Sequence, residues 1–269
     1  KNVITAYTVR KGRKTMLFDS HAHYNDRAFD GDRDEILSKM HENGIEYIIN
    51  AADSMESVGE IIKLAEKYPF VYASAGVHPE NVQNLTEADM EKLKTYAKHE
   101  KVRAIGEIGR DYHYDDVPKD MQKKWFARQI DLAREVKLPV IVHDREAHAD
   151  TLEILRGHHA ADVGGVLHCY SGSAEMVREV LDLGFYLGFG GTLTFKNAKK
   201  VHASAAAAPI ERIVLETDCP YLAPEPHRGT RNSSLLMHYV ADRLAEIKGI
   251  SVGEVEEITQ SNAKKLYGI

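Results

Sequence analysis

Histidine and carboxylate residues that can bind a metal recur along the chain, directly after short apolar runs. His21 and His23 lie two residues apart in the stretch MLFDSHAHYN, residues 16–25. Residues i and i+2 of an extended strand point to the same face, so these two imidazoles would lie side by side. Neutral imidazoles at this spacing can bind a metal ion, and this stretch alone leaves open a pair of surface histidines in a loop.

Further residues of the same kind end later apolar runs. They are His78, Glu107, His143, His168 and Asp218. Without His78, the set consists of four imidazoles and two carboxylates. Such an N/O donor set suits zinc, manganese, cobalt, iron or magnesium. Six ligands are too many for one catalytic ion that must keep an open coordination position. Two divalent ions that share a bridging carboxylate would use all six.

The apolar runs that precede these residues alternate with amphipathic segments. The runs cover residues 16–19, 46–52, 70–78, 102–109, 139–144, 163–169, 185–191 and 212–218. Eight strand–helix units predict an α/β fold, a parallel sheet closed into a (β/α)8 TIM barrel. An open doubly wound sheet is the alternative, disfavoured because no glycine fingerprint follows the first run. Barrel enzymes build their sites where the strands end, so the candidate ligands would meet at one face.

Helical patterns fill the intervals between the runs. Residues 32–44 carry apolar residues at helical spacing and end at Gly44, and residues 120–139 repeat the scheme up to Pro139. Near the C-terminus, Ser251 and Glu254 resemble a capping box that begins a closing helix. Residues 16–269 are therefore interpreted as a single hydrolase domain, and residues 1–15 as an N-terminal extension or a cloning remnant.

The composition is that of a soluble protein with a full core. Of 269 residues, 43% are hydrophobic and 28% charged, and the formal net charge is −6. A polyanionic substrate would therefore need local cations or bound metals. No apolar run approaches the roughly 18 residues that span a bilayer. With two cysteines and no disulfide framework, the expected location is the reducing cytoplasm, without a membrane partner.

Ordered motifs after residue 16 resemble the TatD-type deoxyribonuclease family of metal-dependent hydrolases. These motifs, within residues 18–233, are FDSHAH, AGVHP, AIGEIGRDYHYD, PVIVHDR, HCYSGS, GFGGTLTFK, VLETDCPYLAP and PHRGTRNS. The resemblance implies two divalent ions, Mg²⁺, Mn²⁺ or Zn²⁺. One would be bound by His21, His23, Glu107 and Asp218, and the other by Glu107, His143 and His168. Arg110 departs from the family pattern, in which Leu is more common, and is expected to add a cation beside the site.

The resemblance also implies hydrolysis of a phosphodiester by a metal-activated water. Asp218 would act as general base, Glu107 as the bridging ligand, and His78 as a hydrogen-bond donor to the substrate or the leaving oxygen. Candidate substrate contacts are Tyr112 and His113, which could stack on a base, and His227, Arg228 and Arg231, which could bind phosphate. Rim packing and surface ion pairs are the alternatives for these five residues.

The expected substrate is single-stranded DNA or RNA, cleaved by a 3′–5′ exonuclease that works as a monomer. The acidic net charge argues against a broad basic surface for long duplexes. An aminoacyl-tRNA ester deacylase remains an alternative, because the same activated water could attack a carbonyl. An amidohydrolase or phosphotriesterase on the same barrel is disfavoured, since its usual bridge is a carboxylated lysine and residues 102–109 contain none.

Overall fold

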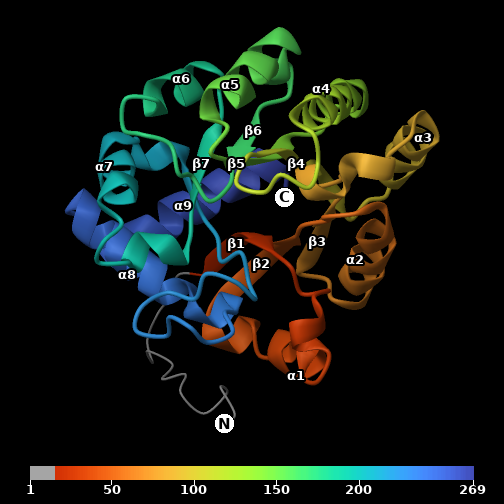
Figure 1. Cartoon of the computed structure of the whole chain (residues 1–269). Helices are drawn as coiled ribbons and strands as arrows, with labels where there is room; N and C mark the ends of the chain where they lie inside the picture. Colours follow the sequence, from red (N-terminus) through yellow and green to blue (C-terminus); the bar gives the residue numbers. More distant parts are fainter. Residues whose placement is uncertain (1–15) are drawn as a thin grey trace.

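The computed structural model describes residues 16–269 as a barrel of parallel strands surrounded by helices (Figure 1). The strands are β1 (Leu17–Ala22), β2 (Ile45–Asn50), β3 (Val71–Ser74), β4 (Val102–Asp111), β5 (Val140–Arg145), β6 (Gly165–Leu167), β7 (Tyr186–Phe189) and β8 (Ile213–Leu215). They are hydrogen-bonded in sequence order. The predicted (β/α)8 barrel is thereby confirmed. Residues 1–15, predicted as an extension, lie outside the described part of the chain.

The barrel closes between β1 and the segment that follows β8. The Asp218 backbone N–H donates to the His21 carbonyl at 2.9 Å, and the His23 N–H donates to the Cys219 carbonyl at 2.8 Å. These hydrogen bonds join the two chain segments that carry His21, His23 and Asp218. Closure of the barrel therefore also brings these candidate ligands together.

Helices cover the outside of the barrel (Figure 1). They are α1 (Arg33–Ser38), α2 (Met55–Lys67), α3 (Glu87–Tyr96), α4 (Lys119–Val136), α5 (His148–Gly157), α6 (Val177–Asp182), α7 (Lys199–Ala207), α8 (Met237–Lys248) and α9 (Val252–Tyr267). The predicted capping box of Ser251 and Glu254 begins α9. The helix predicted over 32–44 is shorter than expected: α1 ends at Ser38, and a 3-10 turn leads to Gly44, whose φ of 82° suits glycine.

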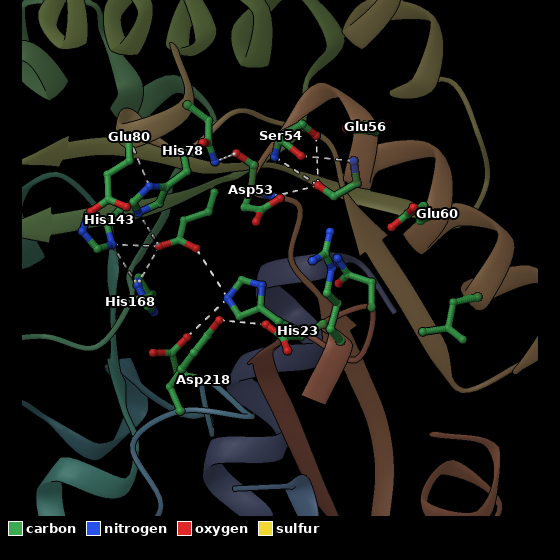
Figure 2. Close-up of a pocket in the computed structure, with 18 of the residues that line it drawn as sticks. His23, Asp53, Ser54, Glu56, Glu60, His78, Glu80, His143, His168 and Asp218 are labelled. Carbon is green, nitrogen blue, oxygen red and sulfur yellow. Dashed lines mark hydrogen bonds and ion pairs between the residues drawn. The ribbon is translucent and has the colours of Figure 1, made fainter. Parts of the chain in front are cut away.

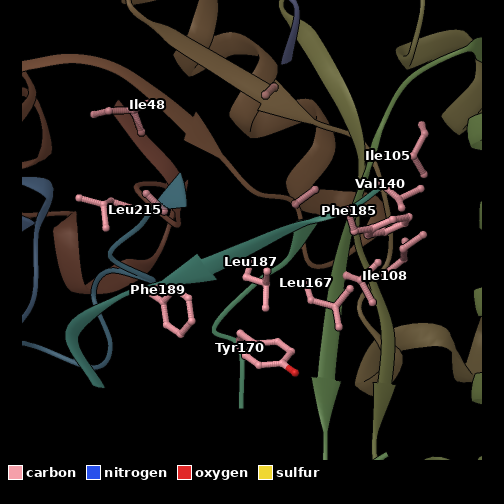
Figure 3. Packing of buried hydrophobic residues seen from close by; sticks show 14 of the residues in the cluster. Ile48, Ile105, Ile108, Val140, Leu167, Tyr170, Phe185, Leu187, Phe189 and Leu215 are labelled. Carbon is pink, nitrogen blue, oxygen red and sulfur yellow. The ribbon is translucent and has the colours of Figure 1, made fainter. Parts of the chain in front are cut away.

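The strands bury both faces, which explains their near-continuous apolar sequences. The outward face packs against the helices in a large cluster that includes Leu167 and Leu187 (Figure 3). The inward face forms a smaller cluster in which Ile141 of β5 and Val166 of β6 meet Tyr267 of α9. Alternation along a strand places His143 on the same face as Ile141, one layer higher. The barrel thus has an apolar floor beneath its ligand-bearing end.

Five strands end earlier than the sequence predicts, namely β2, β3, β6, β7 and β8. Cys169 and Asp218, which follow β6 and β8, have positive φ angles of 44° and 57°. Left-handed backbone cannot continue a strand, so the chain turns where these segments reach the pocket. Within residues 16–269, no helix combines the length and hydropathy that crossing a membrane requires.

Candidate metal centre

The predicted ligands converge at the C-terminal end of the barrel, as Figure 2 shows for His23, His143, His168 and Asp218. Each comes from a strand or from the residues directly after it. These positions are His21 in β1, His23 just after β1, Glu107 in β4, His143 in β5, His168 after β6 and Asp218 after β8. The convergence follows from the barrel geometry, because parallel strands all end at the same face.

Glu107 lies at the centre of the cluster, with each carboxylate oxygen facing a different pair of histidines. Its Oε2 atom lies 3.2 Å from Nε2 of His21 and 3.7 Å from Nε2 of His23. Its Oε1 atom lies 2.8 Å from Nδ1 of His143 and 2.9 Å from Nε2 of His168. The two oxygens of one carboxylate therefore face two different pairs of histidines.

Asp218 joins His21 and His23 on the Oε2 side of Glu107, and these residues form the first ligand set; His143 and His168, on the Oε1 side, form the second. The Oδ1 atom of Asp218 lies 3.3 Å from Nε2 of His23 and 3.7 Å from Nε2 of His21. His78 approaches the second set, since its Nε2 lies 3.7 Å from Oε1 of Glu107. The Nδ1 atom of His78 accepts a hydrogen bond from the Glu80 N–H at 3.3 Å, which leaves Nε2 to carry the proton of the neutral ring.

The charges in the cluster are strongly coupled. Burial would raise the pKa of Glu107, but His168, His21 and the hydrogen bonds from His143 and His168 hold it well below its usual value. Burial opposes charge on His23 and His143 as well. Asp218 nevertheless raises the pKa of His23 to about 9, and Asp111 and Glu107 raise that of His143 to about 9. Imidazolium protons therefore balance the buried carboxylates.

The donor set fits divalent metal ions. Three overlapping groups each have their ligand atoms within 4.8 Å of one another: His21–His23–Glu107, His21–His168–Asp218 and His78–Glu107–His143. A metal ion supplies the positive charge that the imidazolium protons supply here, and its binding would release those protons. The third group includes His78, which the sequence predicts as a hydrogen-bond donor rather than a ligand, so the structure adds it to the possible ligands.

Residues that the sequence analysis did not single out hold the histidine rings in place. The Asp111 carboxylate lies 2.9 Å from Nε2 of His143, and the Ala51 carbonyl lies 3.1 Å from Nδ1 of His23. Buried Glu216 has Oε1 3.7 Å from Nδ1 of His168. Asp111 and the Ala51 carbonyl thus orient the two rings and fix their tautomers, whereas Glu216, beyond hydrogen-bond distance, acts on His168 through its charge. A sequence signal existed, because Asp111 ends an apolar strand and Glu216 is two residues before Asp218.

A buried hydrogen-bond network supports the first ligand set from below. Asp19, fully buried in β1, accepts hydrogen bonds from Thr217 Oγ1 and Ser234 Oγ, both at 2.6 Å. Burial is the main cause that raises the pKa of Asp19 to about 7. The network ties β1 to the segment after β8 and thereby fixes His21 relative to Asp218.

The ligands open into a pocket of about 1180 Å³. Besides the metal centre, its wall includes Tyr114, Arg145 and Tyr221, together with residues from the β1–α1 loop and α2. None of these three residues is among the predicted site residues. Tyr114 and Tyr221 differ from most large hydrophobic side chains of the described region because they are strongly exposed.

The five residues predicted to contact substrate lie outside this pocket wall. The Tyr112 hydroxyl donates to Asp150 at 2.5 Å, and Nδ1 of His113 lies 3.0 Å from Glu146. In the loop after β8, His227 contacts the Tyr239 hydroxyl at 3.1 Å and Arg228 lies over the Phe195 ring. Arg231 forms a two-pronged ion pair with Asp32, at 2.8 and 2.6 Å. The structure therefore does not bring them together with the metal ligands.

Arg110 points away from the pocket, so the expected cation beside the site is not found. Its guanidinium is buried between β4 and neighbouring elements, where Nη2 donates to the Lys119 carbonyl at 3.1 Å. Nη1 lies 3.7 Å from Asp150, and the guanidinium covers the Tyr112 ring at 4.7 Å. The departure from the family pattern is thus a change in packing outside the barrel.

A TIM barrel with a histidine–carboxylate cluster at its C-terminal end defines a class of metal-dependent hydrolases. The chain belongs to the TatD related DNase family, whose sequence model matches residues 18–268. It is similar to the uncharacterized metal-dependent hydrolase YabD of Bacillus subtilis, with 44% identity over 94% of this chain and 100% of the relative. It is also similar to the 3'-5' ssDNA/RNA exonuclease TatD of Cronobacter sakazakii, with 30% identity over 93% of this chain and 97% of the relative.

Among solved structures, the TatD homologue YjjV from Escherichia coli K12 has a similar fold. It superimposes with a TM-score of 0.89 and 30% identity, over 94% of this chain and 98% of that one. The fold, the family and the coarse activity, a metal-dependent hydrolase, agree with the sequence analysis.

Proposed function

We propose that the protein hydrolyses phosphodiester bonds at the 3′ end of single-stranded nucleic acid, using two divalent ions held around Glu107. The observation that carries the proposal is the position of Glu107, with Oε2 facing His21 and His23 and Oε1 facing His143 and His168. The name of the Cronobacter relative, a 3'-5' ssDNA/RNA exonuclease, supports the substrate and the direction.

The ligand roles follow the two oxygens of Glu107. His21, His23 and Asp218 would hold one ion on the Oε2 side, and His143 and His168 would hold the other on the Oε1 side. Divalent ions such as Mg²⁺, Mn²⁺ or Zn²⁺ supply positive charge that acidifies bound water and neutralises charge on phosphate oxygens. All of these ligands come from one chain, so the site suits a monomer.

The protein groups would then handle the protons and orient the substrate. Asp218 would accept a proton from the attacking water at its carboxylate, while the water oxygen forms a bond to phosphorus, the ester P–O bond breaks and the leaving oxygen takes up a proton from solvent. His78 donates a hydrogen bond from Nε2 to a substrate oxygen, because its Nδ1 already accepts from the Glu80 N–H.

Cys169 and Cys219 are free thiols, which suits action in the reducing cytoplasm.

The test is hydrolysis of end-labelled single-stranded DNA and RNA by metal-stripped protein, with Mg²⁺, Mn²⁺ or Zn²⁺ added back. We expect stepwise shortening from the 3′ end that requires a metal and is lost in Asp218→Asn. Asp120→Asn, an exposed carboxylate in the first turn of α4, is the matched control that should keep activity. Intact DNA and RNA with every metal, in protein that still binds the ions, would refute the substrate assignment and direct attention to aminoacyl-tRNA esters.

A further inference from the structure

We propose that Tyr114 and Tyr221 are stacking platforms for the two nucleobases that flank the phosphate at the metal centre. This inference rests on the proposed function and adds how the substrate is recognised. It implies that the pocket binds an unstacked single strand through contacts to its bases rather than through contacts to successive phosphates. Base–aromatic stacking tolerates any base, so the recognition would be largely independent of sequence.

The two tyrosines are unusual in their exposure. Their relative accessibilities are 47% for Tyr114 and 53% for Tyr221, and Leu222 is the other large apolar side chain found exposed among residues 16–269. Both tyrosines line the pocket of the metal centre. A tyrosine ring has a large apolar face and few rotatable bonds, so it can bind a flat partner at low entropic cost.

The two tyrosines follow strands on opposite sides of the barrel. Tyr114 follows β4 and Tyr221 follows β8, and these strands are half a turn apart in a barrel ordered from β1 to β8. Glu107 and Asp218, which belong to the same two chain segments, lie in the ligand cluster between them. A phosphate bound at the cluster would therefore have one tyrosine on each side.

Tyr221 is held in place by the chain around it. Its hydroxyl donates to Asp26 at 2.8 Å, its N–H donates to the Asp218 carbonyl at 2.9 Å, and its own carbonyl accepts from Asn232 at 2.8 Å. Its ring centroid lies 6.3 Å from that of His23. The ring is thus fixed beside a metal ligand before any substrate binds.

Tyr114 packs against a cation of the pocket wall. The guanidinium of Arg145 lies 5.2 Å from the Tyr114 ring centroid and lines the same pocket. Within residues 16–269, Arg145 forms no ion pair at 4 Å or less with a carboxylate, although its charge acts on Glu80 in the same pocket wall. Arg145 comes two residues after His143 in β5, so it can reach a phosphate adjacent to the one at the metals while Tyr114 stacks on the base.

The charge of the pocket argues against binding through several successive phosphates. Its wall carries nine carboxylates and four lysine or arginine side chains. One of those cations, Arg33, already donates hydrogen bonds to the Asp30 carboxylate and to the carbonyls of Tyr24 and Asn25. Figure 2 shows Glu56 and Glu60 of α2 on the far side of His23 from His143 and His168. A backbone of several phosphates would meet repulsion there, so bases must supply much of the binding.

The test compares DNA trinucleotides that carry normal bases with trinucleotides in which stable abasic residues flank the scissile phosphodiester. Tyr114→Leu and Tyr221→Leu should each lower kcat/KM on normal DNA roughly ten-fold or more and leave the abasic substrate unaffected. Tyr114→Phe and Tyr221→Phe keep the ring and should restore activity on normal DNA. Tyr186→Leu, at the opposite end of the barrel in β7, should change neither rate.

Binding provides a readout that does not depend on hydrolysis. With 2-aminopurine next to the 3′ phosphodiester, wild-type protein should quench its fluorescence, and the two Leu variants should not. The dependence of binding on salt should be shallow, with a slope corresponding to about one or two phosphate contacts. Equal losses on normal and abasic DNA, unchanged rates in both Leu variants, or unquenched 2-aminopurine would overturn the stacking platforms. A wild-type protein that quenches but does not cleave would instead overturn the nuclease assignment alone.

Discussion

The Asp111 carboxylate lies 2.9 Å from Nε2 of His143, on the side of the imidazole that faces away from Glu107. The opposite nitrogen, Nδ1, lies 2.8 Å from Glu107. His143 is therefore held between two carboxylates, one inside the metal centre and one behind it. A carboxylate in this outer position orients the ring and makes its other nitrogen a better ligand.

Replacing Asp111 by Asn should weaken metal binding on the Oε1 side of Glu107. The amide keeps the shape but loses the charge that supports His143, so we expect metal affinity to fall roughly 10- to 100-fold. Titration calorimetry on metal-stripped protein would measure this loss. Asp115→Asn, an exposed carboxylate in the loop that follows β4, is the control. Unchanged affinity in Asp111→Asn would show that His143 needs no outer carboxylate.

Arg110→Leu should leave metal binding unchanged and keep or raise the stability. The guanidinium is 2% exposed and its Nε has no hydrogen-bond partner in the described region. Replacing a buried, incompletely paired charge by an apolar side chain is often neutral or stabilising. Urea unfolding should place this variant within about 1 kcal/mol of the wild type, or above it. A loss of more than about 3 kcal/mol would mean that the contacts with Asp150 and Lys119 are essential to the fold.

Much of the fold follows from local sequence patterns. Eight apolar runs separated by helical patterns leave few arrangements other than a parallel barrel, and strand ends in such a barrel meet at one face. This topology predicts that Glu107, His21, His143 and His168 meet at one face, whereas the central position of Glu107 among them is seen only in the structure. The start of helix α9 can also be predicted from the sequence, because the capping box at Ser251 is a local signal.

The substrate-facing residues could not be predicted in the same way. The direction of a loop side chain depends on contacts between segments far apart in the sequence. Arg231 pairs with Asp32, a residue 199 positions away, and the Tyr112 hydroxyl is taken by Asp150. Tyr114 lies only two residues beyond Tyr112, yet it faces the pocket. Composition identified basic and aromatic loops, but only tertiary packing decides which of their side chains are free.

Metal removal should lower the melting temperature. The ions would bind the folded ligand cluster and not the unfolded chain, which adds about 2.7 kcal/mol of stability at a metal concentration 100-fold above Kd. For a chain of this size we expect a rise of roughly 5–10 °C when metal is restored to stripped protein. Differential scanning calorimetry would measure the shift. Glu107→Gln should show little or none of it, and an equal rise in that variant would place the stabilising ions elsewhere.

Anomalous diffraction from crystals grown with Mn²⁺ would show whether Glu107 bridges two metal ions. We predict two anomalous peaks, one between Glu107 Oε2 and the side chains of His21, His23 and Asp218, and one between Glu107 Oε1 and those of His143 and His168. Glu107→Gln crystals should lose or weaken both peaks. A single peak beside Glu107, or two peaks that both persist in Glu107→Gln, would contradict the bridge.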